Sequence, residues 1–208
     1  MPIQVDRESQ REHVTSLAAG LVAQEGVAAL TFRRVAEAAG SSTAIVSTYF
    51  TDKRDLLLST FRAAASRTTV RFEAAINAGG SLQDCLEAWL PLDADRLTDW
   101  RVILAFWGVA VTDPELAAVQ DGHVGRARAR VERLLRAERG TRAERGVRAE
   151  RGVRGDSGSW PPPGLAQQIV ALMLGIALQA VFESGVAGSA ALPQRALLAD
   201  GLARLTQR

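Results

Sequence analysis

The sequence predicts an all-α protein of about nine helices, and three observations support that prediction. Ala, Leu, Val and Arg dominate the composition, and Ala, Leu and Arg enter helices at little entropic cost. Apolar residues recur at the three- and four-residue spacing of amphipathic helices. Segments that alternate β-branched and aromatic residues between turns are nearly absent. With 47% hydrophobic residues in 208, the chain can bury a core.

Three short helices are expected at the N-terminal end. The first covers residues 7–24, has its apolar residues on one face, and is ended by Gly26. The second follows Thr31, a favourable N-cap residue, and ends at Gly40. The third, with the sequence TAIVSTYF, ends at Phe50.

The remaining helices are expected to be longer. Thr51 or Asp52 caps the fourth, Ser81 caps the fifth, and the sequence Asp113-Pro114-Glu115 is a typical helix start. Gly79 and Gly80 are the clearest hinge candidate. The expected ranges are about 53–77, 81–90, 95–111, 113 to at least 134, 165–182 and 193–205.

An arginine- and glycine-rich repeat interrupts this pattern. Residues 136–153 contain three six-residue copies, RAERGT, RAERGV and RAERGV, followed by the linker-like GDSGSWPPPG. A glycine in every sixth position opposes a stable helix, so residues 137–164 are predicted to be a disordered insertion. The alternative is an Arg-rich arm that contacts DNA. Residues 126–154 carry eleven Arg and four Glu, so this segment accounts for the high pI of the chain. The pI is therefore weak support for nucleic-acid binding by the rest of the chain.

Several classes of site and location are not expected. Cys85 is the single cysteine, and His13 and His123 are far apart, so neither a disulfide nor a metal centre is predicted. The sequence has no phosphate-cradling or metalloprotease motif and no Ser/His/Asp arrangement, so we expect no cofactor and no enzymatic activity. There is no signal-peptide pattern, and residues 165–182 are too short and polar for a confident membrane span. A cytoplasmic location is therefore expected.

The second and third helices have the pattern of a helix-turn-helix. Val35 and Ala39 are expected to pack against Val46 and Phe50, which would hold the third helix at a fixed angle. Small and polar residues then remain on its outer face, where they suit close approach to base edges in the major groove. These outer residues are Thr43, Ala44, Ser47 and Thr48.

The stretch LTFRRVAEAAGSSTAIVSTYFTDKRDLL strongly resembles the N-terminal domain of the TetR family. The shared features are Leu30-Thr31, the turn from Val35 to Gly40, and the run from Tyr49 to Lys53, which is the chain's single lysine. The resemblance covers about residues 10–58. It implies that Thr31, Tyr49 and Lys53 contact phosphates and that Arg33 reaches a base or the backbone. The predicted DNA-binding residues are Thr31, Arg33, Ser42, Thr43, Ala44, Ser47, Thr48, Tyr49 and Lys53.

The recognition helix also departs from the family pattern. Many members carry Thr and a second Tyr where this chain has Ile45 and Ser47. Ile45 either meets a thymine methyl group or packs inward, and inward packing is the favoured interpretation. The DNA sequence that is read therefore stays open.

The later part of the chain resembles a second group of regulators. The run ILAFWGVAVTDPELAAVQ resembles the C-terminal domain of the choline-responsive BetI-type regulators. Independently, residues 81–125 carry eight acids and two arginines, and carboxylates with aromatic faces are the groups that bind an amine. The alternatives are that the aromatics are core and the acids solvated, or that the effector is apolar. The candidate ligand-binding residues are Trp89, Asp93, Asp99, Trp100, Phe106 and Trp107.

These observations predict two domains, a helix-turn-helix domain over residues 1–52 and a ligand-binding and dimerisation domain over residues 53–208. The resemblance implies that the last two helices of each subunit form a four-helix dimer bundle. The expected function is a repressor that binds a pseudo-palindromic operator as a homodimer and is released by a small-molecule effector. The alternatives are a non-specific nucleoid-type binder that uses the Arg-rich repeat, and a small helical enzyme.

Overall fold

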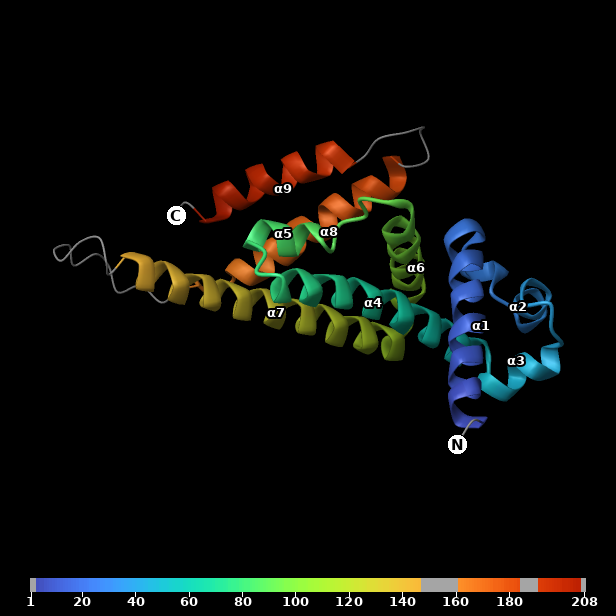
Figure 1. Cartoon of the computed structure of the whole chain (residues 1–208). Helices are drawn as coiled ribbons and strands as arrows, with labels where there is room; N and C mark the ends of the chain where they lie inside the picture. The colour runs from blue at the N-terminus through green and yellow to red at the C-terminus, as the bar shows by residue number, and fades with distance from the viewer. Residues whose placement is uncertain (1–2, 147–160, 184–190, 207–208) are drawn as a thin grey trace. The chain divides into compact units, whose positions relative to one another are not determined.

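The protein is described from a computed structural model, which covers residues 3–146, 161–183 and 191–206 (Figure 1). Within these residues the chain forms nine α-helices and one short 3-10 turn, with no strand, so the all-α prediction is confirmed. Contacts divide it into two compact units. The first contains Met1–Arg71 and Pro91–Ala117, and the second contains Phe72–Leu90 and Ala118–Arg208. This division groups contacts and not functions, so the domain boundary at residue 52 stays a prediction.

The first unit contains the helix-turn-helix. In this unit α1, α2 and α3 lie together, with the 3-10 turn between α1 and α2 (Figure 1). Helix α6 also packs against α1. The elements are α1 (Ile3–Glu25), η1 (Val27–Ala29), α2 (Phe32–Ala38), α3 (Thr43–Tyr49), the larger part of α4 (Lys53–Asn77), α6 (Ala94–Ala110) and the first turn of α7 (Pro114–Gly146).

The second unit is built on α8 (Leu165–Glu183) and α9 (Ala191–Thr206), which pack against each other. A Cβ atom on Gly201 would lie 2.5 Å from Cδ2 of Leu172, so this glycine lets α9 approach α8 closely. Helix α8 is long and apolar enough to cross a membrane by length and composition, but eight of its residues are buried in the protein. The unit also contains α5 (Leu82–Glu87) and most of α7.

Side-chain caps fix where the helices begin. The Thr31 hydroxyl accepts a hydrogen bond from the Arg34 N–H at 3.2 Å, and Ser81 forms a reciprocal capping box with Asp84. Asp113 accepts from two N–H groups at the start of α7. Each of these caps was predicted from the sequence. At α4, the cap is Asp52, whose carboxylate accepts from the Asp55 N–H at 2.8 Å.

Three helices end at glycines with a positive φ, namely α1 at Gly26, α2 at Gly40 and α4 at Gly79. Gly40 has φ 58°, and the N–H of Ser41 donates to the carbonyl of Ala36 at 2.9 Å, which closes the end of α2. Gly79 has φ 75°, and the N–H of Gly80 donates to the carbonyl of Ala75 at 3.0 Å. The pair predicted as a hinge is therefore the C-terminal cap of α4.

Gly40→Ala is expected to destabilise the protein by about 1–2 kcal/mol, because an L-residue is strained in the left-handed region. A Cβ atom there would meet nothing within 4 Å, so backbone strain is the only cost. Gly20→Ala is the control, since Gly20 lies inside α1 with the same open space, and the change should stabilise the helix by up to about 1 kcal/mol. Urea unfolding measures both variants. Equal destabilisation by the two would contradict the assignment of strain to Gly40.

The predicted start of the disordered insertion is wrong for residues 137–146, because α7 continues to Gly146. The Arg, Ala and Glu of the repeat are strong helix formers, and they outweigh its glycines over this stretch. Glu132 and Arg136 form an ion pair at (i, i+4), and Glu138 accepts a hydrogen bond from the Leu82 N–H at 2.8 Å. The part of the insertion at residues 147–160 lies outside the described residues, and 161–164 lead into α8.

Candidate nucleic-acid interface

The core of the helix-turn-helix forms as predicted. Val35 on α2 and Val46 on α3 are fully buried, and Phe50, directly after α3, is 1% exposed. Ala39 is half-buried at the end of α2. Because the buried side of α3 faces α2, its other side is left to solvent.

The exposed side of α3 carries small and polar residues. The hydroxyls of Ser47 and Thr48 donate to the carbonyls of Ala44 and Ile45 on their own helix, at 2.8 and 2.7 Å. Their oxygens can still accept hydrogen bonds, and the hydroxyls can rotate toward another acceptor. The exposed residues at the start and along the outer side of α3 are Ser42, Thr43, Ala44, Ile45, Ser47 and Thr48.

Ile45 corrects one interpretation, because it does not pack inward. Its side chain is 44% exposed, whereas the next residue, Val46, is fully buried. Successive residues lie 100° apart on a helix, so only one of this apolar pair can face the α2 contact. Ile45 therefore adds an apolar group to the outer face of α3.

Helix α1 holds α3 through contacts that the sequence did not predict. Arg7 Nη2 donates to the Thr48 carbonyl at 3.0 Å, and Arg11 Nε donates to the Tyr49 carbonyl at 3.4 Å. The Tyr49 hydroxyl donates to Gln10 Oε1 at 2.9 Å. Arg7 and Arg11 share one face of α1 by their spacing, but the helix end that they bind is set by tertiary packing.

Two of the three predicted phosphate-contacting residues, Thr31 and Lys53, lie at the starts of two different helices. Thr31 is the half-buried N-cap of α2, and Lys53 is exposed at the first residue of α4. Within the described part of the chain, neither Arg33 nor Lys53 has an ion-pair partner. The neighbouring Arg34 is instead held by both carboxylate oxygens of Glu25, at 2.6 and 2.7 Å, and this hydrogen bond lowers the pKa of Glu25.

Next to Lys53, Arg54 joins the start of α4 to the start of α7. Its Nη1 and Nη2 donate to the two carboxylate oxygens of Asp113, at 2.5 and 2.9 Å, and Nη2 also reaches Glu115 at 2.8 Å. The hydrogen bond from Arg54 is the main reason that the pKa of Asp113 falls to about 2. Arg54 is therefore neutralised, and Lys53 keeps its positive charge exposed.

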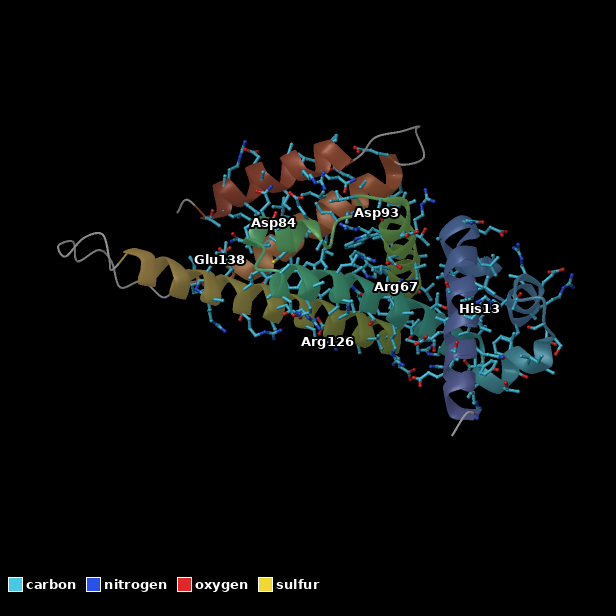
Figure 2. The ribbon with its side chains drawn as sticks, in the orientation of Figure 1. His13, Arg67, Asp84, Asp93, Arg126 and Glu138 are labelled. Carbon is cyan, nitrogen blue, oxygen red and sulfur yellow. The ribbon has the colours of Figure 1, made fainter. Side chains whose placement is uncertain are left out.

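The acids predicted to bind a ligand have partners in the protein. Asp99 is 2% exposed and pairs with Arg67 and Arg71. Asp93 begins α6 as its N-cap and pairs with Arg96 at 2.9 Å (Figure 2). Both carboxylates are thus neutralised by guanidinium groups.

The predicted aromatic residues are mostly core. Phe106 is fully buried and stacks on Phe61 with ring centroids 4.0 Å apart, and Trp100 is 5% exposed. Trp107 is half-buried, and its indole N–H is buried without an acceptor among the described residues. Trp89 lies in the second unit, where it stacks on Phe72 at 4.3 Å.

The remaining reactive side chains lie apart from one another. Burial is the main cause that raises the pKa of the Cys85 thiol, which is a core group as predicted. Burial, followed by the charges of Arg126 and Arg130, lowers the pKa of His123 to about 4. Among the residues that the structure describes, no group of three or more His, Cys, Asp or Glu could hold a metal ion.

Two family descriptions match the chain. Residues 14–60 match the bacterial regulatory proteins of the tetR family, and residues 79–207 match the C-terminal domain of BetI-type transcriptional repressors. No curated protein matches the chain.

Solved structures of transcriptional regulators share the fold. A regulator from Rhodococcus sp. Rha1 has a TM-score of 0.76 and 20% identity, over 95% of this chain and 96% of that one. A regulator from Saccharomonospora viridis in complex with choline has a TM-score of 0.70 and 20% identity, over 93% and 95% of the two chains. The ketosteroid transcriptional regulator KstR2 of Mycobacterium tuberculosis has a TM-score of 0.59 and 14% identity, over 94% and 92%.

Proposed function

Because this chain belongs to the TetR family of bacterial regulatory proteins and carries a BetI-type C-terminal domain, we propose that it is a ligand-responsive repressor that binds a pseudo-palindromic operator as a homodimer. The observation that supports this most directly is helix α3. Its inner residue Val46 is buried against the helix-turn-helix core, and its outer face is small, polar and exposed. Such a face fits the major groove.

The predicted DNA-binding residues and Ile45 divide into two roles in this proposal. Thr43, Ala44 and Ser47 read base edges, and Ile45 meets a thymine methyl group. The others position the protein on the phosphates through hydroxyl, guanidinium and ammonium groups. These positioning residues are Thr31, Arg33, Ser42, Thr48, Tyr49 and Lys53.

Dimerisation is proposed to use α8 and α9. Leu178 and Phe182 on α8 and Leu197 on α9 are 41%, 74% and 49% exposed, so both helices carry large apolar side chains that the described chain leaves open to solvent. A second copy with the same helices would cover them in a four-helix bundle. The two recognition helices of such a dimer would lie about 34 Å apart, or somewhat more, to reach successive major grooves.

The effector is proposed to be a small molecule bound in the C-terminal domain, either a cationic amine or an apolar compound. Choline, held by the Saccharomonospora viridis regulator, is a quaternary amine. Aromatic faces such as that of the half-buried Trp107 would attract a cation. Asp93 and Asp99 are already paired with arginines, so their carboxylates would act only if those pairs opened. The effector lowers operator affinity only if it binds the DNA-free conformation better.

Selection of binding sites from random DNA, followed by fluorescence anisotropy at several salt concentrations, tests the proposal. Lys53→Gln should weaken binding to all sequences and reduce the slope of log affinity against log salt by about one for each phosphate that is no longer bound. Arg133→Ala is the control, because Arg133 is an exposed arginine on α7. It should leave the affinity close to that of the wild type.

Deletion of residues 136–154 separates the proposal from the nucleoid-type alternative. Operator-specific binding should survive this deletion if α3 reads the DNA. Loss of binding on deletion, together with an unchanged affinity in Lys53→Gln, would assign DNA binding to the Arg-rich repeat.

A further inference from the structure

We infer that a cleft between α1 and α4 binds a small polyanion, a molecule that carries two or more carboxylate or phosphate groups. The cleft lies within the first unit and has a volume of about 780 Å³. That volume is in the range of small-molecule sites. Four arginines line it, Arg11 from α1 and Arg62, Arg67 and Arg71 from α4. Its two acids, Glu8 and Glu12, both stand on the α1 side, so the α4 side is basic.

The α4 side keeps a net positive charge after its own ion pair is counted. Arg67 and Arg71 both bind Asp99, with Arg67 Nε 2.8 Å and Arg71 Nη2 2.7 Å from its carboxylate oxygens (Figure 2 labels Arg67). Two guanidinium charges on one carboxylate leave one positive charge in excess. Arg62 is exposed and has no partner among the described residues, so it adds a second.

The same pairing fixes the guanidinium groups in advance. Asp99 is 2% exposed and holds Arg67 and Arg71 from the protein side. Side chains that are already ordered lose less entropy when they bind a ligand, and the planar guanidinium matches carboxylate and phosphate oxygens. A polyanion would therefore meet a partly preorganised site.

Hydrogen-bond donors remain unused in the cleft. A guanidinium has five N–H donors, but Arg71 uses only Nη2 in the described part of the chain. The exposed Ser16 and Ser66 line the cleft, and their hydroxyls bind none of the described residues. Charge-assisted bonds from such donors to anionic oxygens are among the stronger hydrogen bonds in proteins.

The cleft's arginines on α4 lie away from the recognition helix, although Arg11 on the α1 side also donates to the Tyr49 carbonyl at the end of α3. Lys53 is the first residue of α4, and Arg62 and Arg71 follow it by roughly 14 and 27 Å along the helix axis at 1.5 Å per residue. The recognition helix, α3, precedes Lys53. A small free polyanion is therefore the occupant that the observations favour over a DNA phosphate.

Isothermal titration of the full chain with citrate and with pyrophosphate tests this inference without DNA, so its outcome does not depend on the proposed function. We expect saturable binding of citrate, of pyrophosphate or of both, and no saturable binding of acetate at equal ionic strength. The probe with the higher affinity identifies the class of anion. Arg62→Ala should weaken binding at least tenfold and leaves the Asp99 pairs intact. Arg71→Gln should weaken it similarly. Arg133→Ala, an exposed arginine outside the cleft, should bind as the wild type does.

Two results would overturn the inference. One is the absence of saturable binding, or an affinity that Arg62→Ala leaves unchanged. The other is a weaker affinity of Arg62→Ala for DNA while its affinity for citrate and pyrophosphate stays the same, since that would make Arg62 a DNA phosphate contact.

Discussion

Ala44→Glu is expected to abolish operator-specific DNA binding, with a loss of affinity of at least a hundredfold. Ala44 is exposed near the start of α3, on the face that is proposed to enter the major groove. A glutamate there would be too long for the close approach and would bring a negative charge between the phosphate backbones. A hundredfold loss corresponds to about 2.8 kcal/mol. Fluorescence anisotropy against the selected operator measures it.

Ala74→Glu is the matched control for this prediction. Ala74 is exposed on α4, so the substitution adds the same charge away from α3. Both variants should unfold in urea within about 0.5 kcal/mol of the wild type, because neither site is buried. If Ala44→Glu binds the operator as tightly as Ala74→Glu does, α3 is not the reading helix.

Phe106→Ala is expected to give a large loss of stability, about 3–5 kcal/mol in the free energy of unfolding. Phe106 is fully buried in the first unit and stacks on Phe61 at 4.0 Å, with an angle of 13° between the rings. Removing the ring loses its burial and leaves a cavity beside Phe61. Since small domains are stable by about 5–15 kcal/mol, this is a large fraction of the total. Urea denaturation monitored by circular dichroism measures it.

Phe106→Leu separates the loss of volume from the loss of any interaction with a ligand. It keeps most of the apolar volume and should cost less than half as much as the alanine variant. If Phe106→Ala unfolds at the same urea concentration as the wild type, the ring is not part of the core, and its predicted role in ligand binding gains weight.

The features predicted correctly from the sequence are local ones. Thr31, Ser81 and Asp113 begin helices because a short polar side chain can satisfy free N–H groups two or three residues away. The inward position of Val46 follows from the helical repeat and the buried Val35 on α2. Ile45 was ambiguous because it stands beside Val46 and is equally apolar, and only the α2 contact decides which of the two is buried.

The ion pairs could not be predicted because their partners are distant in sequence. Arg54 and Asp113 are 59 residues apart, and Arg67 and Asp99 are 32 apart. The acidity of residues 81–125 favoured a cationic ligand, but the structure gives several of these acids internal roles. Asp84 and Asp93 cap helices, and Asp99 is paired with two arginines.

The residues that pack α3 against the protein are not the residues on its outer face, and this separation affects how the DNA specificity of such regulators can change during evolution. Val46 carries the packing of this helix, whereas Thr43, Ala44 and Ser47 are exposed, and the described hydrogen bonds of that outer trio stay within α3 or its N-cap. Substitutions that touch different neighbours have nearly additive effects on stability. Gene duplicates could therefore acquire new operator preferences by changing the outer residues one at a time, without compensating mutations in the core.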